Sequence, residues 1–384
     1  MKNLYEESHK EIINWLNSLV SINSVYPNEK EICEFIKTKF ENLGYVVKTQ
    51  NISKDRYNIV VTKKEFKHIS NIALYSHLDT VVNVDGWTKN PFKLTLENNK
   101  AYGLGTYDMK GGMVANILTF LDKKLADTQM HLIFCVDEEN ISEGAYKLIE
   151  SNLIKDIKCI VSTEPAFKYD QNGITIGRVG HPIFLLNLKR PSTHFMFYDP
   201  TIDLNLLASK FIKKLKKFYI NKKDKRQFIY VNKYCTINHG MSVPESVEIE
   251  LEIALLPPLD SDKLLNDLKE IIFKESKKFS KDITIDLKFK DRKTPFLNPY
   301  EIDKNNYFLK RLSKAVQIAT KNKAKHYFRS SVGDDNVFAN AGFTVLGIGP
   351  SGGNAHAPDE WVSIPSINTL KEILVQFVCQ SINL

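Results

Sequence analysis

Hydrophobic residues follow two different spacings along most of the chain. In residues 5–19 and 29–43 they recur every three to four positions, which is the spacing of an amphipathic helix. Further on, short apolar runs of strand length alternate with helical patterns. The strands are expected at 57–62, 71–76, 130–135, 157–162 and 344–348, and the helices at 112–125 and 366–380. This alternation predicts an α/β sheet that is covered by helices on both faces.

The pattern changes between about residues 178 and 290. Strands are expected at 184–188, 228–231, 247–253 and 283–287, and helices at 203–218 and 261–279. Their order, β-α-β-β-α-β, is typical of a small ferredoxin-like domain. The strict alternation in 247–253 indicates a sheet with one face in water. We therefore expect two domains, a larger one formed by 1–177 and 291–384 and one inserted into it at 178–290.

The composition is that of an ordinary globular protein. The chain has 384 residues, of which 43% are hydrophobic and 26% are charged. No apolar run is long enough to cross a membrane, and the first residues lack the apolar stretch of a signal peptide. The five cysteines are widely spaced and form no CxxC pair, which is typical of reduced thiols. We expect a cytoplasmic protein with no membrane partner.

The net charge of +8 is concentrated in the segment 210–226, which contains eight lysines and one arginine. Such a segment can attract nucleic acid or another acidic partner. However, Ile212, Leu215 and Phe218 lie between the lysines, as in an amphipathic helix with one solvated face. We therefore expect no nucleic-acid partner.

Polar side chains gather where the predicted strands of the larger domain end. His77 and Asp79 follow the strand 71–76, and the two-residue period of a strand puts both on the same side. Taken alone, such a pair is more often a buried histidine held by its acid than part of a metal site. The other polar groups at strand ends or beside glycine turns are Asp108, Asp137, Glu138, Glu139, Glu164, His356, Asp359 and Glu360.

In open α/β sheets, ligands bind beyond the carboxyl ends of the strands. Two histidines and several carboxylates crowded there would raise the pKa values of the acids, unless a divalent cation neutralised them. A mixture of histidine and carboxylate ligands suits zinc or a similar first-row metal. These residues therefore predict a dinuclear metal hydrolase.

Five motifs, in this order, resemble those of the M20 metallopeptidase family: "SHLDT" (76–80), "GLGTYDMKGG" (103–112), "DEE" (137–139), "TEP" (163–165) and "AHAPDEW" (355–361). The family includes acetylornithine deacetylases, succinyl-diaminopimelate desuccinylases, aminoacylases and carboxypeptidases. The resemblance runs over essentially the whole chain and is strongest to the acetylornithine deacetylase group. It implies a mixed-sheet α/β catalytic domain with an inserted ferredoxin-like domain that serves as a lid and dimerisation domain, and hence a homodimer.

The resemblance also implies two divalent metal ions, zinc or alternatively cobalt. One ion would be held by His77, Asp108 and Glu164. The other would be held by Asp108, Glu139 and His356, with Asp108 as the bridging ligand.

Three further roles follow from the same resemblance. Glu138 would be the general base. Asp79 would hydrogen-bond His77 and so fix its tautomer. His194, from the inserted domain, would stabilise the oxyanion, often across a dimer in family members; His181 is the second choice for that role.

The residues expected to bind substrate depart from the family pattern. Met241 stands where relatives have an asparagine, and Ala254 stands where they have an arginine that helps to bind the substrate carboxylate. Losing that clamp is not a conservative change. Asp334 matches a family aspartate near the substrate. Replacements for the missing base could come from Arg178, Arg190 or Arg329.

We therefore expect an amidohydrolase that removes an N-acyl group from an amino acid or a related small amine. Its substrate would be a small N-acyl amino acid or a short peptide. A dipeptidase or carboxypeptidase on the same scaffold is the alternative. A third possibility is an inactive metal-binding interaction protein that docks through the basic segment 210–226, but the presence of Glu138 beside a ligand argues against it.

Overall fold

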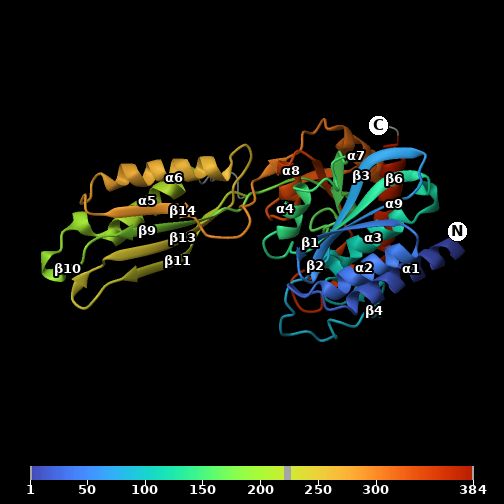
Figure 1. Cartoon of the computed structure of the whole chain (residues 1–384), viewed down its shortest axis with the longest axis horizontal. Helices are drawn as coiled ribbons and strands as arrows, with labels where there is room; N and C mark the ends of the chain where they lie inside the picture. The colour runs from blue at the N-terminus through green and yellow to red at the C-terminus, as the bar shows by residue number, and fades with distance from the viewer. Residues whose placement is uncertain (1, 220–225, 383–384) are drawn as a thin grey trace. The chain divides into compact units, whose positions relative to one another are not determined.

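The computed structural model describes residues 2–219 and 226–382, and the chain divides into two compact units (Figure 1). We call them the main unit and the inserted unit. The main unit comprises Met1–Gly177, Ile302–Phe328 and Gly333–Leu384, and the inserted unit comprises Arg178–Glu301 and Arg329–Val332.

A mixed β-sheet forms the centre of the main unit. In spatial order seven of its nine strands are β1 (Val46–Ser53), β2 (Arg56–Thr62), β6 (Thr128–Cys135), β3 (His68–His77), β7 (Cys159–Ser162), β17 (Thr344–Gly347) and β8 (Gly173–Arg178). The four neighbours β6, β3, β7 and β17 are parallel, whereas β1 and β2 on one side and β8 on the other join in antiparallel pairs. The short strand β16 (Lys325–Arg329) pairs with β8.

Helices cover both faces of this sheet. One apolar core joins the sheet to α1 (Lys2–Val20), α2 (Lys30–Asn42), α3 (Gly111–Phe120), α7 (Tyr307–Thr320) and α9 (Ile364–Cys379). On the opposite face lie α4 (Glu143–Ile149) and α8 (Asp334–Asn340), where Phe338 packs against Tyr75 with ring centroids 5.4 Å apart. Strand β3 is buried on both sides, which explains its continuous apolar run Ile72–Tyr75.

The register of the parallel strands brings their carboxyl ends to one edge of the sheet. His77 is paired with Cys135, Tyr75 with Ser162, and Gly347 with Ser162. The chain segments that follow these strands therefore start side by side, and they carry the polar residues of the predicted metal site.

A second, smaller sheet brings the C-terminal polar loop to the same region. Its order is β18 (Gly352–Gly353), β19 (Trp361–Ser363), β5 (Lys100–Tyr102) and β4 (Thr95–Glu97). The loop between β18 and β19 contains His356 and Glu360. Strand β5 leads into η1 (Thr106–Lys110), which contains Asp108. Asp108 and Glu360, which are 252 positions apart in sequence, thus become neighbours.

The inserted unit has the predicted element order. It runs β9 (Ile183–Lys189), α5 (Leu204–Tyr219), β11 (Ile229–Ile237), β13 (Ser246–Ile253), α6 (Ser261–Ser276) and β14 (Thr284–Phe289). The sheet order is β11-β13-β9-β14, with every pair antiparallel, and α5 and α6 share an apolar core with it. A two-residue ribbon joins β10 (Thr193–His194) to β12 (Ser242–Val243), and β15 (Tyr300–Glu301) ends the unit's long segment.

The predicted mixed α/β fold class is confirmed. One expected helix, 112–125, is shorter in the structure, because α3 ends at Phe120 and a separate 3₁₀ turn covers Lys123–Leu125. Within the basic segment, Lys222, Lys223 and Lys225 lie outside the described residues. Among the residues that the structure does describe, no helix combines the length and the apolar character needed to cross a membrane.

Candidate metal centre

Asp108 lies between two histidines at the carboxyl edge of the main sheet. Its Oδ1 atom is 3.3 Å from Nε2 of His77, and its Oδ2 atom is 3.3 Å from Nε2 of His356. Each histidine has a second carboxylate nearby. The Oε1 atom of Glu164 lies 3.7 Å from Nε2 of His77, and the Oε1 atom of Glu139 lies 3.1 Å from Nε2 of His356.

The structure thus brings together all five predicted metal-binding residues. They form two groups in which one ligand atom from each residue lies within 4.8 Å of the others: His77, Asp108 and Glu164, and Asp108, Glu139 and His356. Asp108 belongs to both groups and offers a different oxygen to each histidine. This is the arrangement expected when one carboxylate bridges two metal ions.

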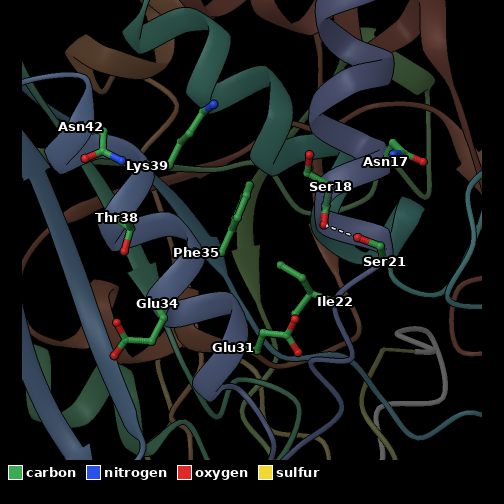
Figure 2. Close-up of a pocket in the computed structure, with 10 residues that line it drawn as sticks. All are labelled: Asn17, Ser18, Ser21, Ile22, Glu31, Glu34, Phe35, Thr38, Lys39 and Asn42. Carbon is green, nitrogen blue, oxygen red and sulfur yellow. Dashed lines mark hydrogen bonds between the residues drawn. The ribbon is translucent and has the colours of Figure 1, made fainter.

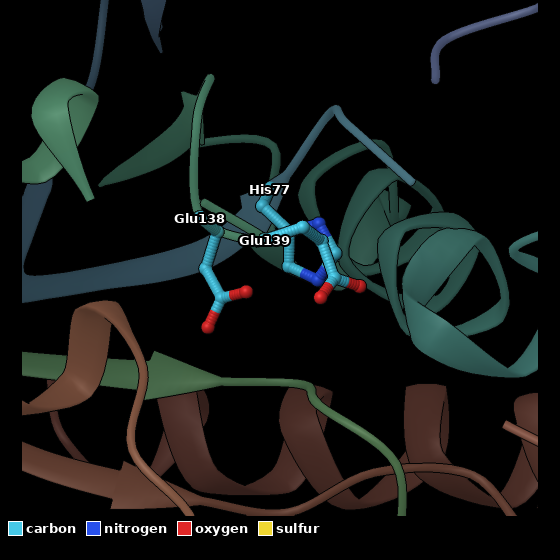
Figure 3. Close-up of side chains that lie close together, drawn as sticks. All are labelled: His77, Glu138 and Glu139. Carbon is cyan, nitrogen blue, oxygen red and sulfur yellow. The ribbon is translucent and has the colours of Figure 1, made fainter. Parts of the chain in front are cut away.

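Glu138 belongs to a third such group, with His77 and Glu139 (Figure 3). Glu138 and Glu139 are consecutive residues of the turn that follows β6, and in this view their side chains leave the turn in different directions. The distances alone would allow Glu138 to bind a metal ion. The role of Glu138 as a general base stays a prediction. Mutagenesis can distinguish this role from metal binding.

The electrostatics of this cluster favour a bound cation. Burial raises the pKa of Glu138 well above its usual range, and the neighbouring Glu164 carboxylate adds to the effect. Burial also raises the pKa of Glu139 to about 7. Hydrogen bonds to Asp108 and Glu139 raise the pKa of His356 to about 10. Crowded acids and histidines that attract protons are both stabilised when a divalent cation lies between them, so the donor set fits such an ion.

Glu360 holds the loop that contains Asp108. Its carboxylate accepts the backbone N–H groups of Gly105 at 2.7 Å, Tyr107 at 2.9 Å and Asp108 at 2.8 Å. Burial raises the pKa of Glu360 to about 7. The sequence placed Glu360 among the strand-end acids but gave no sign that it would bind backbone rather than metal.

Two glycines allow the ligand loops to pack closely. A Cβ atom on Gly112, at the start of α3, would lie 2.0 Å from the carbonyl oxygen of Thr163. A Cβ atom on Gly349 would lie 1.8 Å from the carbonyl oxygen of Glu164. Any other residue at either position would push these segments apart. Only glycine therefore allows the ligand loops to pack this closely.

Asp79 contacts His77 through its backbone. The Nδ1 atom of His77 lies 2.9 Å from the backbone carbonyl oxygen of Asp79, whereas the Asp79 carboxylate is 3.8 Å away. That carboxylate instead accepts the backbone N–H groups of Glu138 at 3.2 Å and Glu139 at 2.9 Å. Asp79 thus does hydrogen-bond the His77 ring as expected, but through its backbone carbonyl oxygen and not through its carboxylate.

Asp334 lies close to the cluster, on the face of β3 to which Tyr75 and His77 both point, and it interacts electrostatically with His77 and Asp79. Its side chain is 1% exposed and accepts a hydrogen bond from the Tyr75 hydroxyl at 2.6 Å. Burial raises the pKa of Asp334 to about 7. Because Tyr75 precedes His77 by two residues on β3, this contact supports the strand that positions the ligand. A contact between Asp334 and substrate stays a prediction.

The remaining predicted residues lie in the inserted unit. His194 is exposed in β10 and accepts the N–H of Met196 at 3.3 Å, whereas His181 is paired with Glu252 at 3.1 Å. Arg178 is 1% exposed and donates to the carbonyl oxygen of Val332 at 3.1 Å. Its contact with substrate stays a prediction, as does the oxyanion role of His194.

The two family positions that differ have opposite environments. The Met241 side chain is 68% exposed, whereas Ala254 is completely buried. A buried alanine offers substrate nothing to bind, so the missing arginine is not replaced at that position.

A surface pocket of about 640 Å³ lies elsewhere in the main unit, between α1 and α2 (Figure 2). It is lined by polar residues such as Asn17, Glu34 and Lys39 together with the apolar Ile22 and Phe35. None of the metal-ligand candidates lines it, so it is not the predicted site.

Comparisons with known proteins agree with this geometry. A family model described as peptidase family M20/M25/M40 matches residues 73–380. An uncharacterized metallohydrolase of Methanocaldococcus jannaschii is 25% identical, covering 96% of this chain and 99% of its own. An acetylornithine deacetylase of Buchnera aphidicola is 26% identical over 94% of this chain and 95% of its own. A probable succinyl-diaminopimelate desuccinylase of Staphylococcus aureus is 26% identical over 72% of this chain and 76% of its own.

Solved structures show the same fold. A tripeptidase from Staphylococcus aureus superposes with a TM-score of 0.77 at 18% identity, covering 97% of this chain and 98% of the other. A dinuclear metal-binding peptidase from Bacillus subtilis superposes with a TM-score of 0.71 at 14% identity, with the same coverage. At these identities the likeness establishes the fold alone.

Proposed function

Because the chain belongs to peptidase family M20/M25/M40, we propose that it is a dinuclear-metal amidohydrolase that removes an N-acyl group from an amino acid or a related small amine. The observation that carries the proposal is the position of Asp108, with one oxygen towards His77 and the other towards His356. A hydrolase of amide bonds is what the family implies. The N-acyl substrate is the part that needs testing.

The five residues of the two groups would hold two zinc ions. Bound there, the ions would polarise the scissile carbonyl and lower the pKa of water towards about 7. The rigid β3 strand and the Glu360-bound loop would keep His77 and Asp108 at the spacing that coordination requires. Cobalt could replace zinc, because both are first-row metals that accept nitrogen and oxygen ligands.

Glu138 would act as the general base. It would take the proton from the attacking water and pass it to the leaving amine. The proposal rests on its position next to Glu139, in the turn that reaches His77. His194 would donate a hydrogen bond to the oxyanion, and its exposed ring leaves it accessible for that purpose.

The inserted unit would form a homodimer. Next to His194, the side chains of Phe195, Met196 and Phe197 are 54%, 69% and 67% exposed. The backbone N–H of Phe195 donates to the carbonyl oxygen of Met241 at 2.8 Å. This bond brings Met241, whose side chain is also exposed, next to the three apolar residues. Exposed apolar groups of this kind mark interaction surfaces. Light scattering should give a dimer mass for the wild type and a monomer mass for Phe197→Glu, and a monomeric wild type would rule out the dimer.

The cysteines fit the predicted cytoplasmic location. Those at positions 33, 135, 159, 235 and 379 are all free thiols in the structure. Burial raises the pKa of Cys33 to about 12, so its thiolate is not accessible near neutral pH. Cellular fractionation would test the location directly.

A substrate screen tests the proposed function. Zinc-loaded protein would be offered N-acetylornithine, other N-acyl amino acids, N-succinyl-diaminopimelate and dipeptides, with Glu138→Ala as the control for contaminating activity. Release of a free amine from the N-acyl compounds supports the proposal. Hydrolysis of the dipeptides alone would favour the dipeptidase alternative, and no hydrolysis of any compound would favour an inactive metal-binding protein.

A further inference from the structure

The turn formed by Asp137, Glu138 and Glu139 is fastened by groups outside the metal-ligand set. From one side, the buried Asp79 carboxylate accepts the N–H groups of Glu138 and Glu139. The other side is fastened through Asp137, whose backbone φ of 75° lies in the left-handed region. Aspartate tolerates this conformation better than most residues, although it remains uncommon.

Asp137 is directed into the protein rather than towards the ligands. Its Oδ2 atom accepts the N–H of Glu143, the first residue of α4, at 2.9 Å. Its Oδ1 atom accepts a hydrogen bond from Nη2 of Arg56 at 2.9 Å. The acid that begins the "DEE" motif therefore anchors the turn, while the two glutamates that follow contribute to the cluster.

Arg56 connects this anchor to a distant part of the main unit. Its guanidinium binds Glu29 through two hydrogen bonds of 2.8 Å each, and Glu29 directly precedes α2. Arg56 is 9% exposed, and Glu29 and Asp137 are completely buried. One arginine thus joins the start of α2, the start of β2 and the turn after β6.

Stability alone is a weak explanation for such a buried ion network. Removing charges from water is costly, and replacing a buried ion pair with apolar residues is often neutral or stabilising. Three charged groups in a fixed geometry do, however, define the position of a backbone turn more sharply than apolar packing does. The turn in question carries a predicted metal ligand and the predicted base.

We propose that Arg56 is a positioning residue for the reaction: acting through Asp137, it sets the placement of Glu138 relative to Glu139. This inference rests on the proposed function, because it assigns these two glutamates their roles. Within the part of the chain that the structure describes, the Arg56 guanidinium bonds to Glu29 and Asp137 and not to either of these glutamates. Its loss should therefore reduce turnover and metal retention more than it weakens substrate binding.

Two variants test the link from either side. In Arg56→Gln, Asp137 loses its cationic partner. In Asp137→Asn, the charge is removed but the amide oxygen can still accept the N–H of Glu143. Each should lower kcat by about 10- to 100-fold, the range found when a group that orients metal ligands is lost, while KM changes by less than about threefold. The kcat of the double variant should be no lower than that of the less active single variant, because both changes break the same connection.

Lys63 provides a matched control. Lys63 directly follows β2, at the end opposite to Arg56, and is 6% exposed. Its ammonium group donates to the carbonyl oxygen of Leu125. The pairing of β2 with β6 places Lys63 far from the turn that follows β6. Lys63→Met also removes a buried cation from the main unit. It should leave kcat per folded, zinc-loaded molecule unchanged, whatever its effect on the melting temperature.

The outcomes separate the inference from the proposed function. Kinetics would be measured on the zinc-loaded, full-length protein, with zinc retention followed by competition with a chromogenic chelator. If the wild type hydrolyses N-acyl amino acids but Arg56→Gln and Asp137→Asn lower only the melting temperature, Arg56 is merely structural and the inference is overturned. Additive losses in the double variant would also overturn it. If the wild type is inactive on every substrate, the proposed function fails, and zinc retention by the variants still decides whether Arg56 positions Glu139.

Discussion

The carboxylate of Glu360 accepts the backbone N–H of Asp108 at 2.8 Å. Glu360 is only 1% exposed, so water does not compete for this bond, and the same carboxylate also binds the N–H groups of Gly105 and Tyr107. A residue near the C-terminus thereby fixes the loop whose aspartate faces both histidines. Glu360 thus supports the candidate metal centre from outside the three groups of possible ligands.

Replacing Glu360 should weaken the metal site. In Glu360→Ala, three backbone donors lose their acceptor in a buried environment, and each unsatisfied donor costs about 1–3 kcal/mol. Metal affinity should fall by about 10- to 100-fold, because the loop that presents Asp108 loses its support. Titration with a competing chelator measures this loss. Asp359→Ala is the control, since Asp359 binds the N–H groups of Thr88 and Lys89 instead; equal metal affinities for the two variants would contradict the role of Glu360.

Glu138 and Glu139 should respond differently to mutation although they are adjacent. Glu138→Ala should retain both metal ions and lose at least about 10²-fold in turnover, the usual scale of general-base catalysis. Glu139→Ala should lose metal as well as activity. Metal analysis of both purified variants, combined with their turnover, decides the question. If Glu138→Ala loses a metal ion, Glu138 is a ligand and the base must be sought elsewhere.

Much of the metal centre was predictable because parallel strands align their carboxyl ends. His77 ends a buried strand, and Glu139 and Glu164 each follow one by a few residues, so a correct prediction of the strands already places them at one edge. Asp108 and His356 were noted beside glycine turns and strand ends, and the family resemblance implied their roles as ligands. These two come from loops whose positions depend on the small sheet of β4, β5, β18 and β19, which has strands too short to show in a hydrophobic pattern.

The supporting contacts were not predictable from the pattern. Periodicity indicates the side of a strand on which Asp79 lies, but not that its carboxylate binds two backbone N–H groups while its carbonyl takes the histidine ring. Asp137 appeared to be another strand-end acid. Its left-handed backbone turns it towards Arg56, and no sequence spacing reports that dihedral angle. Helix α4 was missed for a simpler reason, since seven residues are too few for a helical period to emerge.

His131 should make stability depend on pH below neutrality. Burial lowers the pKa of His131 from 6.5 to about 4 in the folded protein. Between these values the unfolded chain binds a proton that the folded chain does not, so stability is complete above pH 6.5 and is lost as pH falls towards 4. The effect amounts to no more than roughly 3 kcal/mol. Urea unfolding at pH 7 and pH 5 should show a smaller difference in His131→Gln than in the wild type. An equal difference would show that His131 does not titrate in this way.

The central claim is that Asp108 bridges two metal ions that the hydrolysis requires. It is tested most directly by measuring metal content and N-acyl hydrolysis on the same samples before chelation, after chelation and after zinc is returned. The wild type should contain two divalent ions per chain, lose both together with its activity, and recover both. Asp108→Asn should bind less metal and be inactive at every stage. Full activity in chelated protein, or one ion per active chain, would contradict the account.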